Sequence, residues 1–145
     1  GALPYLLGFV AMQLNGWHSD KTRERRWHVA VPTLIGAAAL GGLMTQPGSF
    51  AFSMLLFTLV GMGMAYLPAF WAVPTEILSQ SAAAAAVGMI NAVGSVAGFA
   101  SPYLFGYLNT STGSFAYGLA ALMLSALAGG LLMLGAPRPE AASGR

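Results

Sequence analysis

The sequence predicts an all-α integral membrane protein with five transmembrane helices. Of its 145 residues, 57% are hydrophobic and only 7% are charged, whereas soluble domains carry about 25% charged residues. So few charges cannot form a polar shell, but a bilayer removes that need because lipid contacts apolar side chains directly. The charges are also clustered. Six of the ten lie between Asp20 and Arg26, and residues 29–75 and 77–137 carry none.

The same composition excludes several classes of site and partner. Cysteine is absent, so neither disulfides nor Cys-ligated metals are possible. The net charge of +2 comes from one segment and argues for membrane topology, and no basic stripe with interleaved aromatic residues indicates nucleic-acid binding. We expect no cofactor, no metal and no catalytic residues. The lipid bilayer is the expected surrounding.

Five apolar runs predict the spans, since a helix crosses a bilayer with about 20 apolar residues. The first begins at Gly1 without an initiator Met, so we expect the chain to begin inside a longer protein. Pro68 and Pro74 are expected to disturb the third helix because each lacks an N–H donor. A polar turn is expected at 109–114. The spans form a bundle over 1–136 and are placed at about 1–16, 28–46, 50–72, 82–108 and 114–135, followed by a disordered tail at 137–145.

The charged segment orients these spans. Cytoplasmic loops of membrane proteins carry an excess of Lys and Arg, so loop 16–28 is predicted to be cytoplasmic. Two uncharged spans then return Glu76 to the same side, and two more return Arg138. We therefore predict a multi-pass protein of the plasma (inner) membrane, with an outside N-terminus and a cytoplasmic C-terminus.

The loop also contains a motif. Gly16, Asp20, Lys21, Arg25 and Arg26 give the frame Gly-x-x-x-Asp-Lys-x-x-x-Arg-Arg between two spans. This frame resembles the cytoplasmic signature of the major facilitator superfamily, which occurs after the second helix and, more loosely, after the eighth. Arg23 stands where the family prefers Gly, and Glu24 interrupts the basic run. Such degeneracy is typical of the second copy.

A second pattern lies downstream. Phe70-Trp71-Ala72-Val73-Pro74-Thr75-Glu76, then Asn91, Gly94, Gly98 and Pro102, is similar to the anion:cation symporter branch. The resemblance implies helices 8–12 of a twelve-helix fold, with the N-terminal half of the same chain as partner. It also implies a secondary active transporter that moves small organic anions such as tartrate, sugar acids or related carboxylates, together with H⁺.

The motif loop has two interpretations. It is either a solvated loop that only sets topology, or a conformational latch made of Gly16, Asp20, Lys21, Arg25, Arg26 and Glu76. Gly16 would allow close approach at the helix end. Glu76 is the only acid in the interior of the chain outside this loop, so we hypothesise that it pairs with Arg25 or Arg26.

Asn91 has two interpretations as well. Its amide needs partners inside a span, and Asn91, Gly94, Ser95 and Gly98 fall broadly on one helical face. Gly94 and Gly98 match the small-residue pattern for helix packing, which would make Asn91 an interhelical hydrogen-bonding group. Alternatively, this face lines the substrate path, with Asn91 and Ser95 as substrate-binding candidates, and the resemblance implies that an Asn at the place of Asn91 contacts the anion.

Trp71 lies at a span end, where aromatic belts are common, but in the resembled branch this Trp borders the central cavity. His18 and His28 flank the charged loop and are predicted to be interfacial. Neither is predicted to bind metal, since no carboxylate or second His is expected to share their helical face at a ligand spacing.

Two other function classes compete with a transporter. A membrane enzyme would need acid, His or nucleophile clusters at one membrane face. The only cluster in the sequence, Asp20 to Arg26, has no matching acidic or His partner set, so we predict no enzyme. The alternative is a small membrane assembly or structural subunit without transport activity. It would explain the glycine content but not the motif frame.

Overall fold

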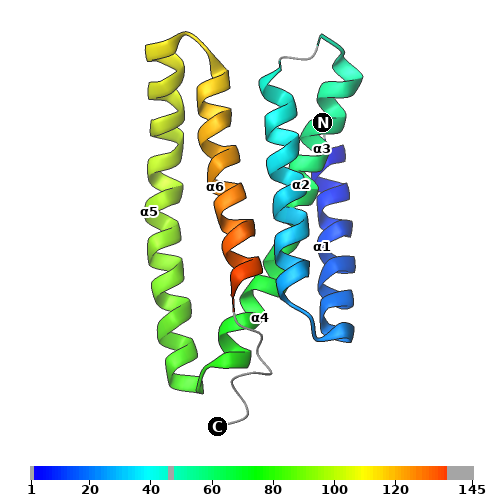
Figure 1. Cartoon of the computed structure of the whole chain (residues 1–145), viewed down its shortest axis with the longest axis vertical. Helices are drawn as coiled ribbons and strands as arrows, with labels where there is room; N and C mark the ends of the chain where they lie inside the picture. Colours follow the sequence, from blue (N-terminus) through cyan, green and yellow to red (C-terminus); the bar gives the residue numbers. More distant parts are fainter. Residues whose placement is uncertain (1, 46–47, 137–145) are drawn as a thin grey trace.

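The computed structural model describes residues 2–45 and 48–136, and these form helices joined by short connections, without a strand. Five helical passes run side by side along the long axis (Figure 1). They are α1 (Leu3–Thr22), α2 (Arg26–Met44), the interrupted pass α3 (Phe50–Gly63), η1 (Met64–Tyr66) and α4 (Leu67–Ile77), then α5 (Gln80–Thr112) and α6 (Phe115–Gly135). The predicted all-α membrane fold is confirmed. The predicted tail at 137–145 lies outside the described residues.

Four of the passes are long and apolar enough to cross a membrane: α2, the α3–α4 pass, α5 and α6. The first helix, α1, is 20 residues long but is not among them, because its second half contains Gln13, Asn15, His18, Asp20 and Lys21. These polar residues lower its mean hydropathy, so α1 is a weaker candidate than the predicted first span suggested.

The predicted loop 16–28 is largely helical, which corrects that prediction. Helix α1 continues to Thr22 and α2 begins at Arg26, so the connection consists of residues 23–25. Charged side chains at a helix end favour the helix when they match its dipole, and Lys21 lies in the last turn of α1. The turn itself is made by Arg23, which has φ of 52°.

The expected effect of the prolines is smaller than predicted. Pro68 cannot donate to the carbonyl of Met64, which instead accepts from the N–H of Leu67 in the short 3-10 turn η1. Pro74 lies inside α4, and the helix continues past the predicted end at residue 72 to Ile77. The third pass is therefore one helix with a tight turn in its middle.

The predicted turn at 109–114 is also mostly helical. The hydroxyls of Thr110 and Thr112 donate to the carbonyls of Gly106 and Leu108 one turn back, at 2.9 and 2.6 Å. Polar side chains that bond to their own helix do not have to end it. Helix α5 ends at Gly113, whose φ of 68° suits a residue without a Cβ.

Close crossings between backbones hold the first three passes together. A Cβ on Gly8 of α1 would lie 2.9 Å from the carbonyl oxygen of Gly61, and a Cβ on Gly63 would lie 2.9 Å from the Cα of Gly36 on α2. Small residues allow helices in membranes to approach in this way. A small apolar cluster of Ala39, Leu43 and Leu56 lies beside these crossings.

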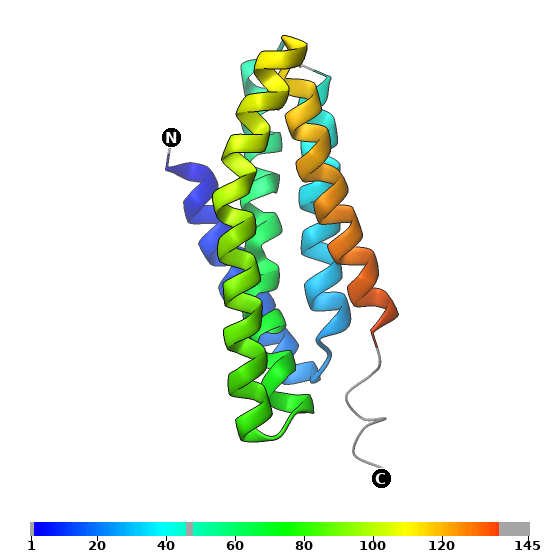
Figure 2. The same cartoon turned by 90° about the vertical axis from the view of Figure 1, so that its left-hand side faces the viewer.

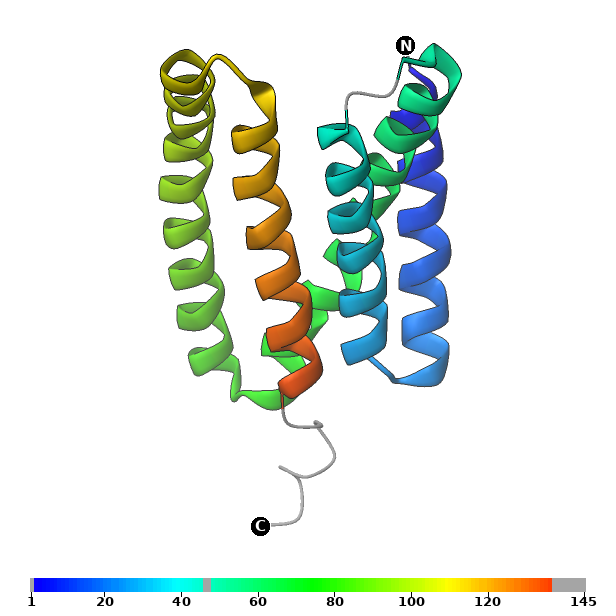
Figure 3. The ribbon, with the colours of Figure 1, turned by 45° about the horizontal axis from the view of Figure 1, so that its top comes forward.

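Helix α5 lies at the edge of the bundle (Figures 1 and 3). It packs against α6 and α4 and against no other described element. Figure 2 shows α5 from its open side, in front of the other helices. Only Ala83 is buried on this helix of 33 residues. Most of its surface is therefore available to lipid or to another polypeptide segment.

Candidate functional site: the motif between α1 and α2

Arg25 is the centre of a polar cluster that joins the α1–α2 connection to α4. Its Nε donates to Oε1 of Glu76 at 3.0 Å, and its Nη2 contacts the same oxygen. Its Nη1 donates to Oδ1 of Asp20 at 2.6 Å and to Oγ of Ser19 at 2.9 Å. The hypothesised pairing of Glu76 with one of the two arginines therefore exists in the structure, and the arginine is Arg25.

Because Arg25 is buried, its charge depends on these partners. The side chain of Arg25 is 9% exposed, whereas those of Asp20 and Glu76 are 71% and 36% exposed. A charge removed from water needs a partner and further hydrogen bonds, and the two carboxylates provide both. The hydrogen bond to Glu76 is the main cause that raises the pKa of Arg25, against the effect of its burial. Arg25 is thus charged at any accessible pH.

Ser19 is a member of this cluster that sequence reasoning missed. It is fully buried, accepts from Arg25, and donates to the backbone carbonyl of Glu24 at 2.8 Å. The sequence feature that could have pointed to Ser19 is its position directly before the motif residue Asp20. Ser19 fixes the turn 23–25 against the end of α1, so that Arg25 points towards α4.

The other motif residues have distinct surroundings. Gly16 allows α1 to approach α4, because a Cβ there would lie 3.0 Å from Cβ of Pro68. Lys21 lies over the ring of Trp17, 5.0 Å from its centroid. Nε of Arg26 is buried without a hydrogen-bond partner among the described residues. Asp20 binds Arg25 of its own turn and not a neighbouring helix.

Arg23 explains one departure from the family pattern. Its φ of 52° lies in the left-handed region, which is costly for a residue with a Cβ and free for glycine. Glycine is the residue that the family prefers at this place. Arg23 thus adopts a backbone conformation for which glycine is the more favourable residue.

The two histidines meet across the connection, which corrects the prediction that neither shares a face with a carboxylate or a second His. Nδ1 of His18 lies 2.6 Å from Nε2 of His28, and Nδ1 of His28 lies 3.0 Å from Oε2 of Glu24. Glu24 and His28 are one helical turn apart, and this spacing was visible in the sequence. No group of three or more metal-ligating side chains that could hold a metal ion occurs in the described ranges.

Asn15 is a second residue that the sequence did not single out. Its side-chain amide donates to the carbonyls of His28 on α2 and Ala65 in η1, both at 2.8 Å. The carbonyl of His28 would otherwise bond to the residue four positions later, but that residue is Pro32, which has no N–H. Asn15 therefore connects three elements where the backbone needs a donor.

Trp71 lies on α4 and is half-buried. Its ring stands edge-on to that of Phe70, with centroids 5.3 Å apart. Phe70 in turn contacts Tyr66 with centroids 6.1 Å apart. Trp71 thus ends an aromatic row that runs from Tyr66 in η1 onto α4, the helix that carries Glu76.

Asn91, Gly94, Ser95 and Gly98 all lie on the exposed surface of α5. A Cβ added to Gly94 or Gly98 would meet no atom within 4 Å. The packing partner predicted for these glycines is therefore not another described helix. In the described part of the chain, no hydrogen bond joins Asn91 to Trp71 or to a motif residue.

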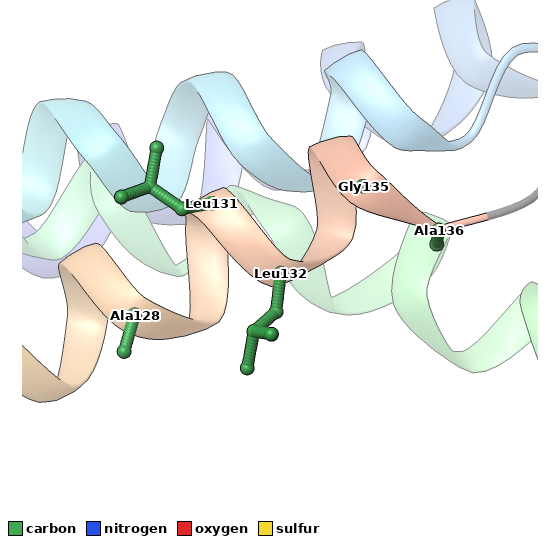
Figure 4. Close-up of a pocket in the computed structure, with 5 residues that line it drawn as sticks. All are labelled: Ala128, Leu131, Leu132, Gly135 and Ala136. Atoms are coloured by element: carbon green, nitrogen blue, oxygen red, sulfur yellow. The ribbon is translucent and has the colours of Figure 1, made fainter.

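A hollow at the end of α6 is apolar and separate from these residues. Figure 4 shows that it is lined by side chains of Ala and Leu, with Gly135 at its end: Ala128, Leu131, Leu132, Gly135 and Ala136. It offers no polar side chain to an anion. The hollow suits lipid tails better than a charged substrate.

Comparison with known proteins identifies the family. A protein of Agrobacterium vitis whose name assigns it, provisionally, to tartrate transport is 41% identical over 120 residues, which cover 81% of this chain and 27% of that relative. The inner membrane transport protein RhmT of Escherichia coli is 36% identical over 135 residues, which cover 91% of this chain and 30% of the relative. The chain belongs to the major facilitator superfamily.

A further member of this group is the metabolite transport protein NicT of Pseudomonas putida, 32% identical over 114 residues. No family model and no solved structure matches the chain. The chain spans less than a third of the length of these major facilitator superfamily relatives. The resemblance drawn from the motif loop and the Trp71 pattern is confirmed.

Proposed function

We propose that the chain forms helices 8–12 of a secondary active transporter that moves small organic anions, such as tartrate, sugar acids or related carboxylates, together with protons. The observation that carries this proposal is the similarity to two relatives named for tartrate transport, at 41% and 40% identity. Each relative is more than three times as long as the matched segment. The remaining helices of such a transporter would come from the rest of a longer chain.

The membrane orientation follows from the charges. The α1–α2 connection, α4 and the end of α6 lie at one end of the bundle (Figures 1 and 3). The basic residues of the motif belong to this end, so the proposal places it on the cytoplasmic side of the inner membrane.

Within this transporter, the cluster around Arg25 acts as the conformational latch. Arg25 is held by Asp20 from its own turn and by Glu76 from α4. Withdrawing one partner of such an ion pair is costly, because the buried charge that remains is then uncompensated. A shift of α4 relative to the α1–α2 connection would separate Arg25 from Glu76, so the pair favours one arrangement of these elements over another.

Charge compensation for the anion and the proton is assigned to the rest of the protein. Residues 29–75 and 77–137 contain no Asp, Glu, Lys or Arg. The charged residues of the candidate spans, Arg26 and Glu76, lie at span ends and not in the middle, where proton pathways use charge. Contacts from this chain would be polar and aromatic, from Trp71, Asn91 and Ser95.

Uptake by the full-length protein in proteoliposomes tests the proposal. Labelled L-tartrate and D-galactonate would be supplied with an inward proton gradient, without one, and with a protonophore. We expect uptake of at least one anion that exceeds the level of empty liposomes and falls when the gradient is dissipated. Uptake that ignores the gradient would contradict proton coupling. No uptake of any organic anion would contradict transport and favour an assembly subunit.

A further inference from the structure

The His18–His28 pair is the titratable group nearest to the motif that the proposed latch does not use. Nδ1 of His18 and Nε2 of His28 are 2.6 Å apart, and the ring centroids are 4.9 Å apart at an angle of 42°. The second nitrogen of His28 faces the carboxylate of Glu24 at 3.0 Å. His28 is therefore held on both sides, by one helix end and by the connection.

The number of protons on the two rings determines whether the contact between them can persist. With Glu24 ionised, Nδ1 of His28 carries a hydrogen, and one more hydrogen lies between the two rings. One additional proton can be taken up at the outer nitrogen of His18 without loss of the contact. A second would place two N–H groups opposite each other at the observed 2.6 Å, with two adjacent positive charges. The rings must then separate.

The same residues hold the turn that presents Arg25. The backbone carbonyl of Glu24 accepts from Ser19, which also accepts from Arg25. The carboxylate of Glu24 accepts from the N–H of Trp27 at 2.9 Å. Separation of His28 from His18 therefore acts on Glu24, and through Glu24 on the position of Ser19 and Arg25.

The elements that carry or adjoin the pair hold seven charged residues. They are Asp20 and Lys21 on α1, Arg23, Glu24 and Arg25 in the connection, Arg26 on α2 and Glu76 on α4. Of these, Glu24 is the one in contact with an imidazole. New positive charge on the rings also competes with Arg25 for the nearby carboxylates.

We propose that His18 and His28 form a proton-binding site that releases Arg25 from Glu76 when both rings are protonated. Imidazole nitrogens can both accept and donate protons, so the two facing rings are the part of this connection where proton uptake would change a contact. This inference rests on the proposed transport function, because it gives the regulation of the same latch.

The test uses the full-length protein in nanodiscs at about pH 7.5 and 5.5, with the same pH on both sides. Hydrogen exchange of Arg25 Nε–H is followed by NMR, with the signal assigned from Arg25→Lys. Guanidinium exchange is base-catalysed, so it slows at lower pH if the ion pair is unchanged. We expect faster exchange at the lower pH in the native protein. His18→Gln and His28→Gln should lose this inversion.

Arg23→Asn is the matched control, because it removes one positive charge from the same turn and Asn tolerates the left-handed region. It should keep the inversion. Slower exchange at low pH in the native protein, or an inversion that persists in both histidine variants, overturns the proposal. If a chelator abolishes the inversion, the proposal is also overturned, because the two histidines then bind a metal ion. Anion counterflow measured on the same samples is a separate readout, so absence of transport is distinguished from absence of the proton site.

Discussion

Arg25 carries its charge on a side chain that is only 9% exposed, and its two acidic partners differ in how far they are exposed to water. Breaking a buried ion pair costs about 3–5 kcal/mol because the remaining charge stays uncompensated, while an exposed pair contributes about 0–1 kcal/mol. From its exposure, the ion pair of Glu76 should contribute a free energy between these limits, and that of Asp20 should contribute about as much as an exposed pair. The two acids should therefore contribute unequally.

We predict that Glu76→Gln destabilises the protein by about 2 kcal/mol, and Asp20→Asn by less than about 1 kcal/mol. The midpoint of thermal unfolding in detergent, measured for both variants beside the native protein, checks the order. Equal effects would contradict the assigned exposure. Unchanged transport and an unchanged population of inward and outward states in Glu76→Gln would contradict the latch.

Glu24 gives a prediction about pH. Burial raises the pKa of this carboxyl, but hydrogen bonds from the N–H of Trp27 and from His28 outweigh burial, and the net shift is below the ordinary value of 4.5. A lowered folded pKa contributes stability that is present above 4.5 and is lost as pH falls through the folded value.

The difference in thermal midpoint between the native protein and Glu24→Gln should therefore shrink as the pH falls below about 4.5. Midpoints at four or five pH values measure it, with Arg23→Asn as a variant of the same turn that should show no such trend. A difference that grows on acidification would contradict the assigned hydrogen bonds.

At the scale of helices, glycines allow the backbones of neighbouring helices to approach closely where the helices cross. A Cβ at Gly63 would lie 2.9 Å from backbone atoms of Gly36, and backbone cannot move aside as a flexible side chain can. A Cβ at Gly129 of α6 would meet nothing within 4 Å. Both positions are helical, so helix propensity favours alanine equally at each.

We predict that Gly63→Ala lowers the thermal midpoint and that Gly129→Ala leaves it unchanged or raises it. Overpacking of a close contact costs about 1–3 kcal/mol, whereas Gly to Ala in an open helical position gains up to about 1 kcal/mol. Thermal unfolding of the two variants side by side is the measurement. A loss of stability in both would mean that helix packing at Gly63 is not the cause.

The passes were predictable from the sequence because apolar runs and charge clusters are averages over many residues. The helix ends were less predictable. Residues 17–22 and 109–112 are polar and suggested loops, but Thr110 and Thr112 bond to their own helix, and the charges at the end of α1 are compatible with its dipole. Polarity alone does not distinguish a loop from a helix end that reaches water.

The polar cluster was half predictable for a similar reason. Opposite charge and a shared membrane side were enough to suggest Glu76 with Arg25 or Arg26, but not to choose between the two arginines. Ser19, Asn15 and the His18–His28 contact depend on the angle at which α1, α2 and η1 meet. That angle follows from glycine crossings and from carbonyls left free by prolines, and neither can be inferred from the local pattern around each residue.

At the scale of the whole molecule, α5 is the least covered helix, and its exposed surface carries Asn91, Gly94, Ser95 and Gly98. The relatives are more than three times longer than the segment they share with this chain. A transporter of that length has further helices to place, and α5 is the described helix with most free surface. Its open side would then face either a helix of the remaining protein or the substrate path.

Asn91→Ala in the full-length protein separates these two possibilities. If the amide contacts the anion, its loss removes a hydrogen bond to a charged group worth about 1.5–3 kcal/mol, which corresponds to a rise in KM of about tenfold or more. Folding should be unaffected, since the Asn91 side chain is exposed and forms no hydrogen bond within the described residues. Ser125→Ala is the control, because its hydroxyl bonds to its own helix at Ala121. A lower thermal midpoint with an unchanged KM would instead assign Asn91 to packing against another helix.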